Sequence, residues 1–371
     1  MKQLKLLIID DDLAQVQLIL DRIKEKNVEL RKRELEIIPE NLKSGEEAIF
    51  KVTSNDYNAA IVDLKLSDDK TKTDGNDIIK EIKTKMRFPV FVLSNFPQDL
   101  EPDFDKETDV FKIRERSNTD LGAMIDEIVN LYISGISELF GENGKLEKYI
   151  TESLSELFWG RIAITWSYLI ERIPDPEIRV KIISRQLNTI LKEKMGQAEF
   201  GFEKSEPFEV YMIPSLKKHT YTGDILQKED IYYVVLTPAC DIVSRVENKP
   251  DIEYILLSEL TELKKHSYIK NCWKDGQLIL SSDNKKVLQR IISNKKSEYH
   301  FLPPFNKSMG FVIDFTNIKS IKYDELKDYK IVASIVESFM KNIISRFTNF
   351  YNRLGQPDFD EEKIFEEMKY L

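Results

Sequence analysis

The first third of the chain alternates between short apolar runs and amphipathic helical segments, and this alternation constrains the fold most. The apolar runs are continuous, as in strands buried on both faces, and the segments between them carry apolar residues at helical spacing. Five strands that alternate with helices predict a doubly wound five-stranded parallel sheet of the α/β class. The predicted strands are 4–9, 35–38, 59–64, 89–93 and 110–111, and the predicted helices are 13–23, 44–52, 76–86 and 121–132.

The rest of the chain has a different pattern. A long helical stretch at 146–170 is followed by two prolines and by a second predicted helix at 178–195. From 208 to 315 the chain consists mainly of predicted short strands, and a last amphipathic helix is predicted at 330–351. We therefore predict three parts, which are a first domain at 1–133, a helical linker or dimerisation segment at 134–200, and an α+β, β-rich output or partner-binding domain at 201–371.

Composition limits the classes of protein that the chain can belong to. Its 371 residues predict more than one domain, and its net charge of −9 disfavours binding to a phosphate backbone. Cys240 and Cys272 lie far apart, which indicates neither a disulfide framework nor a zinc knuckle. The sequence contains neither a secretory signal nor an apolar run of membrane-spanning length, so we expect a cytoplasmic protein.

Polar side chains follow the predicted strands of the first domain. Asp10 and Asp11 come after the first strand and Asp63 after the third, while Ser94 and Lys112 end the fourth and fifth. The carboxyl ends of parallel strands meet at one edge of a sheet, so these groups are expected to converge. Clustered carboxylates favour a hard cation such as Mg²⁺, and a carboxylate can attack phosphorus. A hydroxyl and an ammonium group suit the oxygens of the transferring group.

These motifs carry a resemblance to a known family. IIDDD, IVDLKL with a following glycine at Gly75, VLSN and VFK occur in the order, and roughly at the spacing, of the receiver domains of two-component response regulators, so 1–133 resembles that CheY-like family. The resemblance implies a phosphoryl group received from a histidine kinase. It assigns Asp63 as phosphoacceptor, Asp10, Asp11 and Asp63 as Mg²⁺ ligands, and Ser94 and Lys112 as switch and phosphate-binding groups.

Two departures from the family bear on signalling. The stretch between Ser94 and Lys112 is short, which predicts a stunted fourth helix and an unusual route of signal output. In receivers, the residues two after the acceptor and two after the hydroxyl flank the path of the hydrolytic water. Here they are Lys65 and Phe96. Phe96 cannot orient a water and Lys65 can reach phosphoryl oxygens, so we hypothesise a long-lived aspartyl phosphate.

The C-terminal two-thirds offers features with two interpretations each. Cys240 and Asp241 would form a nucleophilic or metal-binding pair if a histidine approached, although a cysteine is more often a small core residue. The basic run at 285–296 would contact nucleic acid or be a solvated face, and the second is more common. The helix at 146–170 is either a core helix or the contact surface of a homodimer.

We expect a regulator that signals to a downstream effector through a C-terminal module that does not bind DNA. The alternatives are a receiver-gated enzyme with its active site in the C-terminal domain and a DNA-binding transcription regulator. The segments TPACD, FLPPF and YNRLGQP resemble, in general texture, modules of bacterial antiviral conflict systems. That resemblance implies a histidine-kinase-like ATPase as partner, and a regulator or phosphate buffer in antiviral defence.

Overall fold

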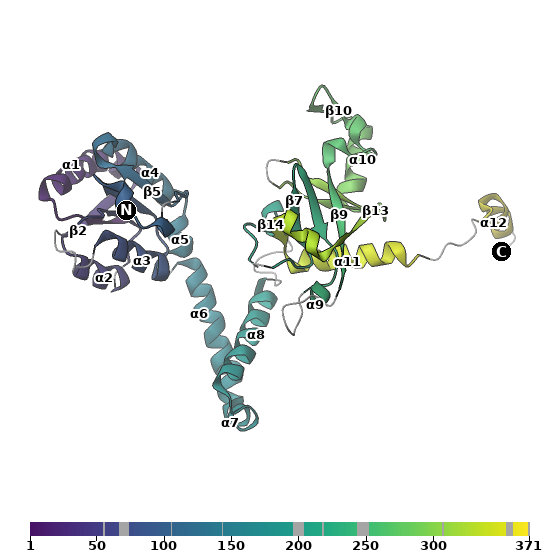
Figure 1. Cartoon of the computed structure of the whole chain (residues 1–371), viewed down its shortest axis with the longest axis horizontal. Coiled ribbons are helices and arrows are strands. Elements are labelled where there is room, and N and C mark those ends of the chain that lie inside the picture. The colour runs from purple at the N-terminus through teal and green to yellow at the C-terminus, as the bar shows by residue number, and fades with distance from the viewer. Residues whose placement is uncertain are drawn as a thin grey trace. The chain divides into compact units, whose positions relative to one another are not determined.

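A computed structural model describes most of the chain, and Figure 1 shows its elements. The chain divides into two compact units, Met1–Phe202 and Glu203–Leu371. Among the described residues, no helix is long and apolar enough to cross a membrane. The described residues are 1–54, 56–66, 74–104, 106–142, 144–195, 204–216, 219–242, 252–305, 308–353 and 359–369.

Unit 1 begins with the predicted parallel sheet. Its spatial order is β2-β1-β3-β4-β5, and every neighbouring pair is parallel. This is the flavodoxin-like doubly wound order, in which the chain reverses direction across the sheet between β1 and β3. The predicted fold class is therefore confirmed for this part. The strands are β1 (Lys2–Ile9), β2 (Leu35–Leu42), β3 (Ala59–Val62), β4 (Val90–Ser94) and β5 (Phe111–Glu115).

Helices cover both faces of this sheet. One core joins the sheet to α1 (Leu13–Leu30) and α4 (Leu121–Ile133), and a second core joins it to α2 (Gly45–Ser54) and α3 (Gly75–Lys85). Alternate residues of each strand enter opposite cores, which explains why the strands are continuous apolar runs. The helices start at fixed points because an aspartate caps each of three N-termini, namely Asp12, Asp74 and Asp120.

The connection between β4 and β5 contains no α-helix among its described residues. It forms two short 3₁₀-helices instead, η2 (Pro97–Asp99) and η3 (Pro102–Phe104). The ammonium group of Lys83 lies over the rings of Phe104 and Phe111, 4.6 and 3.7 Å from their centroids. The prediction of a stunted fourth helix is confirmed, and β5 is the edge of the sheet on that side.

A helical hairpin completes unit 1 after the short α5 (Ile136–Phe140). In Figure 1, α6 and α8 run side by side and α7 lies at the turn between them. This arrangement agrees with the two predicted helices at 146–170 and 178–195. The hairpin consists of α6 (Lys145–Leu157), a π-helical turn (Phe158–Ile162), α7 (Ala163–Arg172) and α8 (Pro176–Met195).

Unit 2 is built on a seven-stranded antiparallel sheet in the order β12-β13-β9-β8-β7-β14-β6. A separate hairpin pairs β10 with β11. The prediction of a β-rich α+β domain is confirmed. The strands are β6 (Tyr211–Met212), β7 (Asp224–Lys228), β8 (Ile231–Val235), β9 (Tyr254–Glu262), β10 (Trp273–Lys274), β11 (Gln277–Leu278), β12 (Tyr299–Leu302), β13 (Phe311–Lys322) and β14 (Lys330–Ile335).

Helix α11 (Glu337–Tyr351) covers one face of that sheet. Its Met340 and Ile343 are buried in the same core as Phe315 of β13. The other helices of unit 2 are α9 (Ala239–Ile242), α10 (Ser282–Ile292) and α12 (Glu361–Met368).

The predicted helix at 330–351 is wrong in its first six residues. They form β14, which pairs with β7 and β6, and α11 (Glu337–Tyr351) starts only afterwards. Pairing with two strands that are distant in sequence decides the conformation of this segment.

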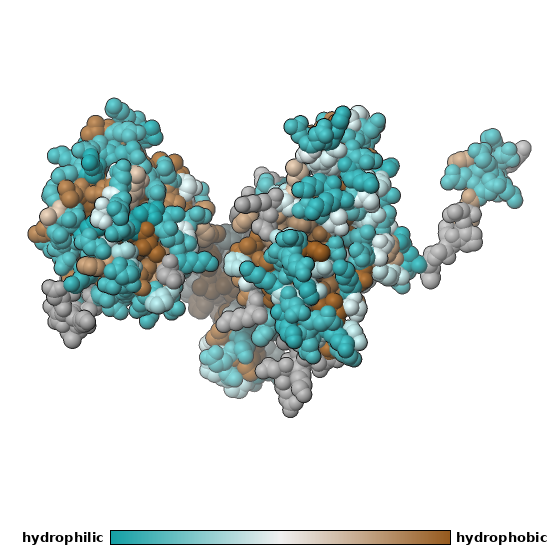
Figure 2. Space-filling view, turned by 45° about the horizontal axis from the view of Figure 1, so that its top comes forward, coloured by the Kyte–Doolittle hydropathy of each residue, from teal (hydrophilic) through white to brown (hydrophobic). Residues whose placement is uncertain are grey.

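The surface is mainly hydrophilic. In the face shown in Figure 2, teal residues cover most of both units, and brown hydrophobic residues appear in patches between them. Single exposed apolar residues are ordinary on protein surfaces. The exposed aromatic residues Phe158, Trp159 and Trp166 of the hairpin, however, are clustered.

Candidate functional site

Three carboxylates meet at the carboxyl edge of the parallel sheet. Oxygens of Asp10, Asp11 and Asp63 all lie within 4.8 Å of one another. The register explains why, because Ile9 of β1 is the partner of Val62 of β3, and an aspartate follows each. Asp10 and Asp63 are buried, whereas Asp11 is exposed. The structure thus brings together the three acids that the sequence places after these strands.

Backbone amides fix both buried carboxylates. Asp63 donates its N–H to the carbonyl of Ile9 at 2.9 Å, and its Oδ1 accepts from the N–H of Leu64 at 2.8 Å. Asp10 Oδ1 accepts from the N–H of Asp12 at 2.9 Å. The side-chain amide of Asn41, which the sequence gave no reason to single out, donates to the carbonyl of Asp10 at 3.3 Å.

Gly75 lies directly against the backbone of Asp63. A Cβ atom at this position would be 2.2 Å from the carbonyl oxygen of Asp63 and 2.6 Å from Cα of Leu64. The N–H of Gly75 donates to the carbonyl of Leu64 at 3.0 Å. No other residue type fits here without moving Asp63, so the start of α3 sets the position of this carboxylate.

A guanidinium group supplies the positive charge of the site. Nη2 of Arg116 lies 2.7 Å from Asp10 Oδ2 and 3.3 Å from Asp63 Oδ2, and it donates to the carbonyl of Leu93 at 3.2 Å. The side chain of Arg116 is only 8% exposed. Its Nε is buried and has no hydrogen-bond partner among the described residues. One cation therefore contacts two buried carboxylates and offsets part of their charge, and its Nε–H is not used by any of these contacts.

Lys112, predicted to end the fifth strand in this site, does not end it. In the register of β4 and β5, Lys112 is opposite Phe91, whereas Ser94 is opposite Glu115. The strand continues for three residues past Lys112, so that prediction of the strand end is wrong. The sequence misleads because an edge strand tolerates charged residues, which look like the end of a strand.

The charge of Lys112 acts on another carboxylate. The pKa of Glu107 is lowered mainly by a hydrogen bond from the N–H of Ile113, and Arg114 and Lys112 lower it further. The cation in contact with the aspartates is thus Arg116, the residue that follows β5. Sequence reasoning missed it because the predicted strand was too short.

Burial makes the ionised form of Asp10 less favourable. The pKa of Asp10 is raised to about 6, first by burial, against the attraction of Arg116, and further by the charges of Asp63 and Asp11. A cation placed among the oxygens would stabilise the ionised form. Three carboxylates are hard oxygen ligands of the type that Mg²⁺ binds, so the donor set fits this metal.

The remaining predicted residues surround the cluster. Ser94 is buried at the end of β4, and its Oγ accepts from the N–H of Phe96 at 3.3 Å. Lys65, two residues after Asp63, and Phe96 are both exposed. Their predicted effect on the lifetime of a phosphoryl group stays a prediction.

The C-terminal pair Cys240 and Asp241 lies on the single turn α9. The exposed thiol of Cys240 donates to Asp241 Oδ1 at 3.2 Å. His266 stacks edge-on against Tyr299 at 4.6 Å, and burial, with a smaller effect of a nearby arginine, lowers the pKa of His300 to about 4. Within the described residues, no set of three metal-ligating side chains includes Cys240. A site there stays a prediction.

The basic run at 285–296 lies on α10 and the turn after it. Lys286 is 3.8 Å from Asp283, and Lys296 is 3.8 Å from Glu298. Neighbouring acids of this kind are typical of a solvated, salt-bridged face. The expectation that nucleic acid is not a partner stays a prediction.

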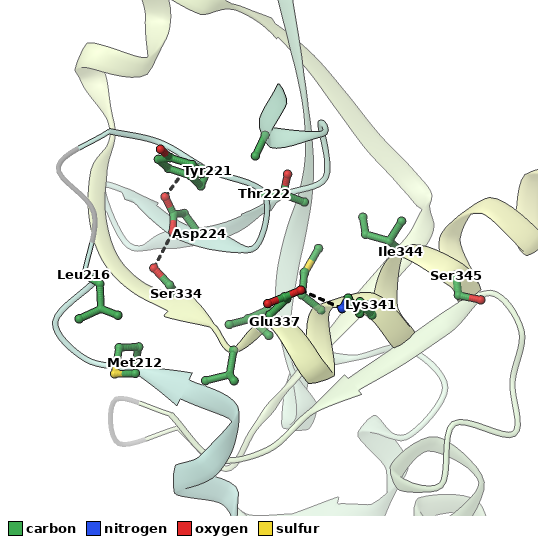
Figure 3. A pocket seen from close by; sticks show the side chains of 14 residues that line it. Met212, Leu216, Tyr221, Thr222, Asp224, Ser334, Glu337, Lys341, Ile344 and Ser345 are labelled. Carbon is green, nitrogen blue, oxygen red and sulfur yellow. Dashed lines mark hydrogen bonds and ion pairs between the residues drawn. The ribbon is translucent and has the colours of Figure 1, made fainter. Parts of the chain in front are cut away.

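Unit 2 also has a cavity of about 680 Å³ beside α11. Figure 3 shows Asp224 at its wall, between Tyr221 and Ser334. Asp224 accepts from the N–H of Tyr221 at 2.7 Å and from Oγ of Ser334 at 2.6 Å, and Met212 and Leu216 make the lining largely apolar. Both oxygens of this buried carboxylate are therefore already bonded within the fold, which assigns Asp224 a role in holding β7 to β14.

Comparisons with known proteins concern the parallel-sheet part. No family model matches the chain, and no curated protein matches it. Among solved structures, a Francisella response-regulator receiver domain is 21% identical, covers 35% of this chain and 97% of its own, and has a TM-score of 0.26. A CheY-like receiver domain from Methylobacillus flagellatus is 18% identical over 35% of this chain and 99% of its own, with a TM-score of 0.26.

A third similar structure carries ligands. It is the response regulator TrrA from Thermotoga maritima, described in complex with Mg²⁺–BeF, and it is 21% identical over 35% of this chain and 99% of its own, with a TM-score of 0.24. The resemblance to antiviral conflict systems has no support in these comparisons.

The geometry predicts that Arg116, and not Lys112, stabilises the site. Arg116→Ala would leave Asp10 and Asp63 as buried charges without a guanidinium, at a cost of roughly 3 kcal/mol in the opening free energy of β1 and β3. Hydrogen–deuterium exchange of the full chain measures this local free energy. Mg²⁺ should restore protection in Arg116→Ala more than it adds to wild type, because the metal takes over the charge of the guanidinium.

Lys112→Ala is the matched control, since it removes a cation from the same strand region without touching the aspartates. We expect nearly unchanged exchange in this variant. Equal losses of protection in the two variants would contradict the assignment.

Proposed function

We propose that the parallel-sheet part of unit 1 accepts a phosphoryl group on Asp63. One observation carries the proposal, namely the convergence of Asp63 with Asp10, Asp11 and Arg116 at the carboxyl edge of the sheet. In open α/β sheets this edge, at the strand-order reversal, is where ligands bind. An acidic cluster with one guanidinium is suited to a metal-assisted transfer of an anionic group.

The proposed reaction uses the Asp63 carboxylate as a nucleophile. A carboxylate oxygen attacks phosphorus of a phosphohistidine, the new O–P bond forms as the P–N bond breaks, and the imidazole leaves with the electron pair and takes up a proton. The product is a mixed anhydride on Asp63. The hydrogen bond from Leu64 to Oδ1 and the close contact with Gly75 hold this carboxylate in one orientation before the attack.

The charge of the transferred group needs several partners. Asp10, Asp11 and Asp63 would hold Mg²⁺, which when bound supplies charge neutralisation for phosphoryl oxygens. Ser94 ends the neighbouring strand, where its hydroxyl can donate to a phosphoryl oxygen. Arg116 has a buried Nε–H to donate as well, so the guanidinium can move from neutralising carboxylates to binding the phosphoryl group.

The Arg116 contacts also suggest how phosphorylation is sensed. Before transfer the guanidinium is shared between Asp10 and Asp63, and after transfer the phosphoryl oxygens compete for it. A change in this one contact would reach Leu93 of β4, whose carbonyl accepts from the same nitrogen. The expected phosphoryl donor is a histidine kinase or a kinase-like ATPase. The expected recipient of the signal is the C-terminal module or a downstream effector.

Phosphotransfer tests the proposal directly. With acetyl phosphate and Mg²⁺, wild type should incorporate phosphoryl groups and Asp63→Asn should incorporate none, because the amide is not a nucleophile. Chelation of Mg²⁺ should lower incorporation in wild type to the level of Asp63→Asn. Phosphate-affinity electrophoresis measures the modified fraction. Incorporation by Asp63→Asn equal to that of wild type would overturn the proposal.

The residues beside the acceptor predict a long lifetime of the aspartyl phosphate. Phe96 offers no hydrogen bond to a hydrolytic water, and Lys65 can neutralise phosphoryl oxygens. Label on the purified full chain should therefore persist well beyond seconds, and Lys65→Ala should shorten its half-life several-fold. Loss of label from wild type within seconds would rule out this prediction while leaving phosphorylation of Asp63 itself untouched.

A further inference from the structure

The helical hairpin has a small apolar core and many exposed apolar side chains. Its own core consists of Leu157, Ile162 and Ile190, with Ile183 and Leu187 partly buried against them. Two helices that share so small a core are marginal in water, because most helical stability in proteins comes from packing of an apolar face. The hairpin therefore needs a partner against which its exposed apolar side chains can pack.

One flank of the hairpin is an apolar groove of about 500 Å³, which we call the tryptophan groove. Phe158, Trp159 and Trp166 line it and are 49%, 70% and 44% exposed. Leu154 and Leu157 continue the lining along α6. The groove thus contains a hollow and protruding aromatic rings in one patch.

An apolar stripe extends the tryptophan groove along α6. Leu146, Ile150, Leu154 and Phe158 follow one another at intervals of four residues, and all are exposed. Residues four apart lie on one face of a helix, so the stripe is continuous. It is the pattern of a helix that packs against another helix.

The exposed area is on the scale of a stable interface. Aromatic side chains carry roughly 150–250 Å² each, so the three rings of the groove expose roughly 250–400 Å², a large part of the ~800 Å² that one partner contributes to a standard interface. The aliphatic stripe on α6 adds to this area. The largest apolar patch on a typical monomer is roughly 300–600 Å² and is often functional, so the rings and the stripe together indicate an interaction site.

We propose that the tryptophan groove binds the same groove of a second copy of this chain, so that two hairpins form a four-helix bundle. A two-fold interface is self-complementary, and a patch that offers both a hollow and protruding rings meets this condition. Bundles of four helices bury apolar stripes of this kind in a common core.

Charge favours the same partner. Within α8 there are five basic residues and two acidic ones, a net charge of +3, whereas α6 has two basic and three acidic ones, a net charge of −1. Within one hairpin Lys194 of α8 already pairs with Glu156 of α6 at 2.9 Å. Two copies related by a two-fold axis can bring α6 of each against α8 of the other, which extends this attraction across the interface.

The inference is independent of phosphorylation, because no residue of the Asp63 site takes part in it. Sedimentation equilibrium of the full chain should give twice the monomer mass of 43.5 kDa. The double variant Phe158→Ser with Trp159→Ser should give half the wild-type mass at the same concentration. Asp63→Asn should keep the wild-type mass, which separates this proposal from the proposed function.

Ile164→Ser is the matched control, since Ile164 is 77% exposed on the same hairpin and does not line the tryptophan groove. The Ile164→Ser variant should keep twice the monomer mass. Circular dichroism should show that this variant and the double variant have the helix content of wild type. A wild-type chain that stays monomeric would overturn the proposal even if the double variant fails to fold. A dimer that survives the double variant, or one that Ile164→Ser abolishes, would also overturn it and assign the groove to another partner.

Discussion

The contact of one guanidinium with two buried carboxylates governs the N-terminal part of this chain. Asp10 and Asp63 are held at the carboxyl edge of the sheet by backbone amides, and their charges would repel each other without a cation. Arg116 supplies that cation from the end of the edge strand. Burial still raises the pKa of Asp10 to about 6, so the site retains a demand for further positive charge.

The sequence predicted the acids of this contact but not its cation. The five parallel strands and the three acids follow from local patterns, because strands buried on both faces are continuous apolar runs and the residues after them meet at one edge. The identity of the cation could not be predicted, because β5 is an edge strand and its charged residues look like the end of a strand. The strand continues past Lys112, and the cation in contact with the aspartates is Arg116, which follows β5. The strand β14 was missed for a related reason, because distant strands decide its conformation.

The structure also separates reaction from output. The groups that we propose for phosphoryl transfer lie at strand ends between the two cores, whereas the helix expected between β4 and β5 is reduced to η2 and η3. The carbonyl of Leu93 accepts from the guanidinium of Arg116, whose Nε has no partner among the described residues, so both groups would respond to a change in charge at the site. In our proposals the hairpin holds two copies together both with and without the phosphoryl group, and phosphorylation acts within that dimer.

The position of the phosphoryl group on the chain tests the assignment of Asp63 as acceptor. After reaction with acetyl phosphate and Mg²⁺, hydroxylamine converts an aspartyl phosphate to a hydroxamate, and mass spectrometry of peptides locates it. We expect a single modified residue, Asp63, in a chain that still carries Asp10 and Asp11 unmodified. A hydroxamate on Asp10, on Asp11 or elsewhere in the chain, with Asp63 unmodified, would contradict it.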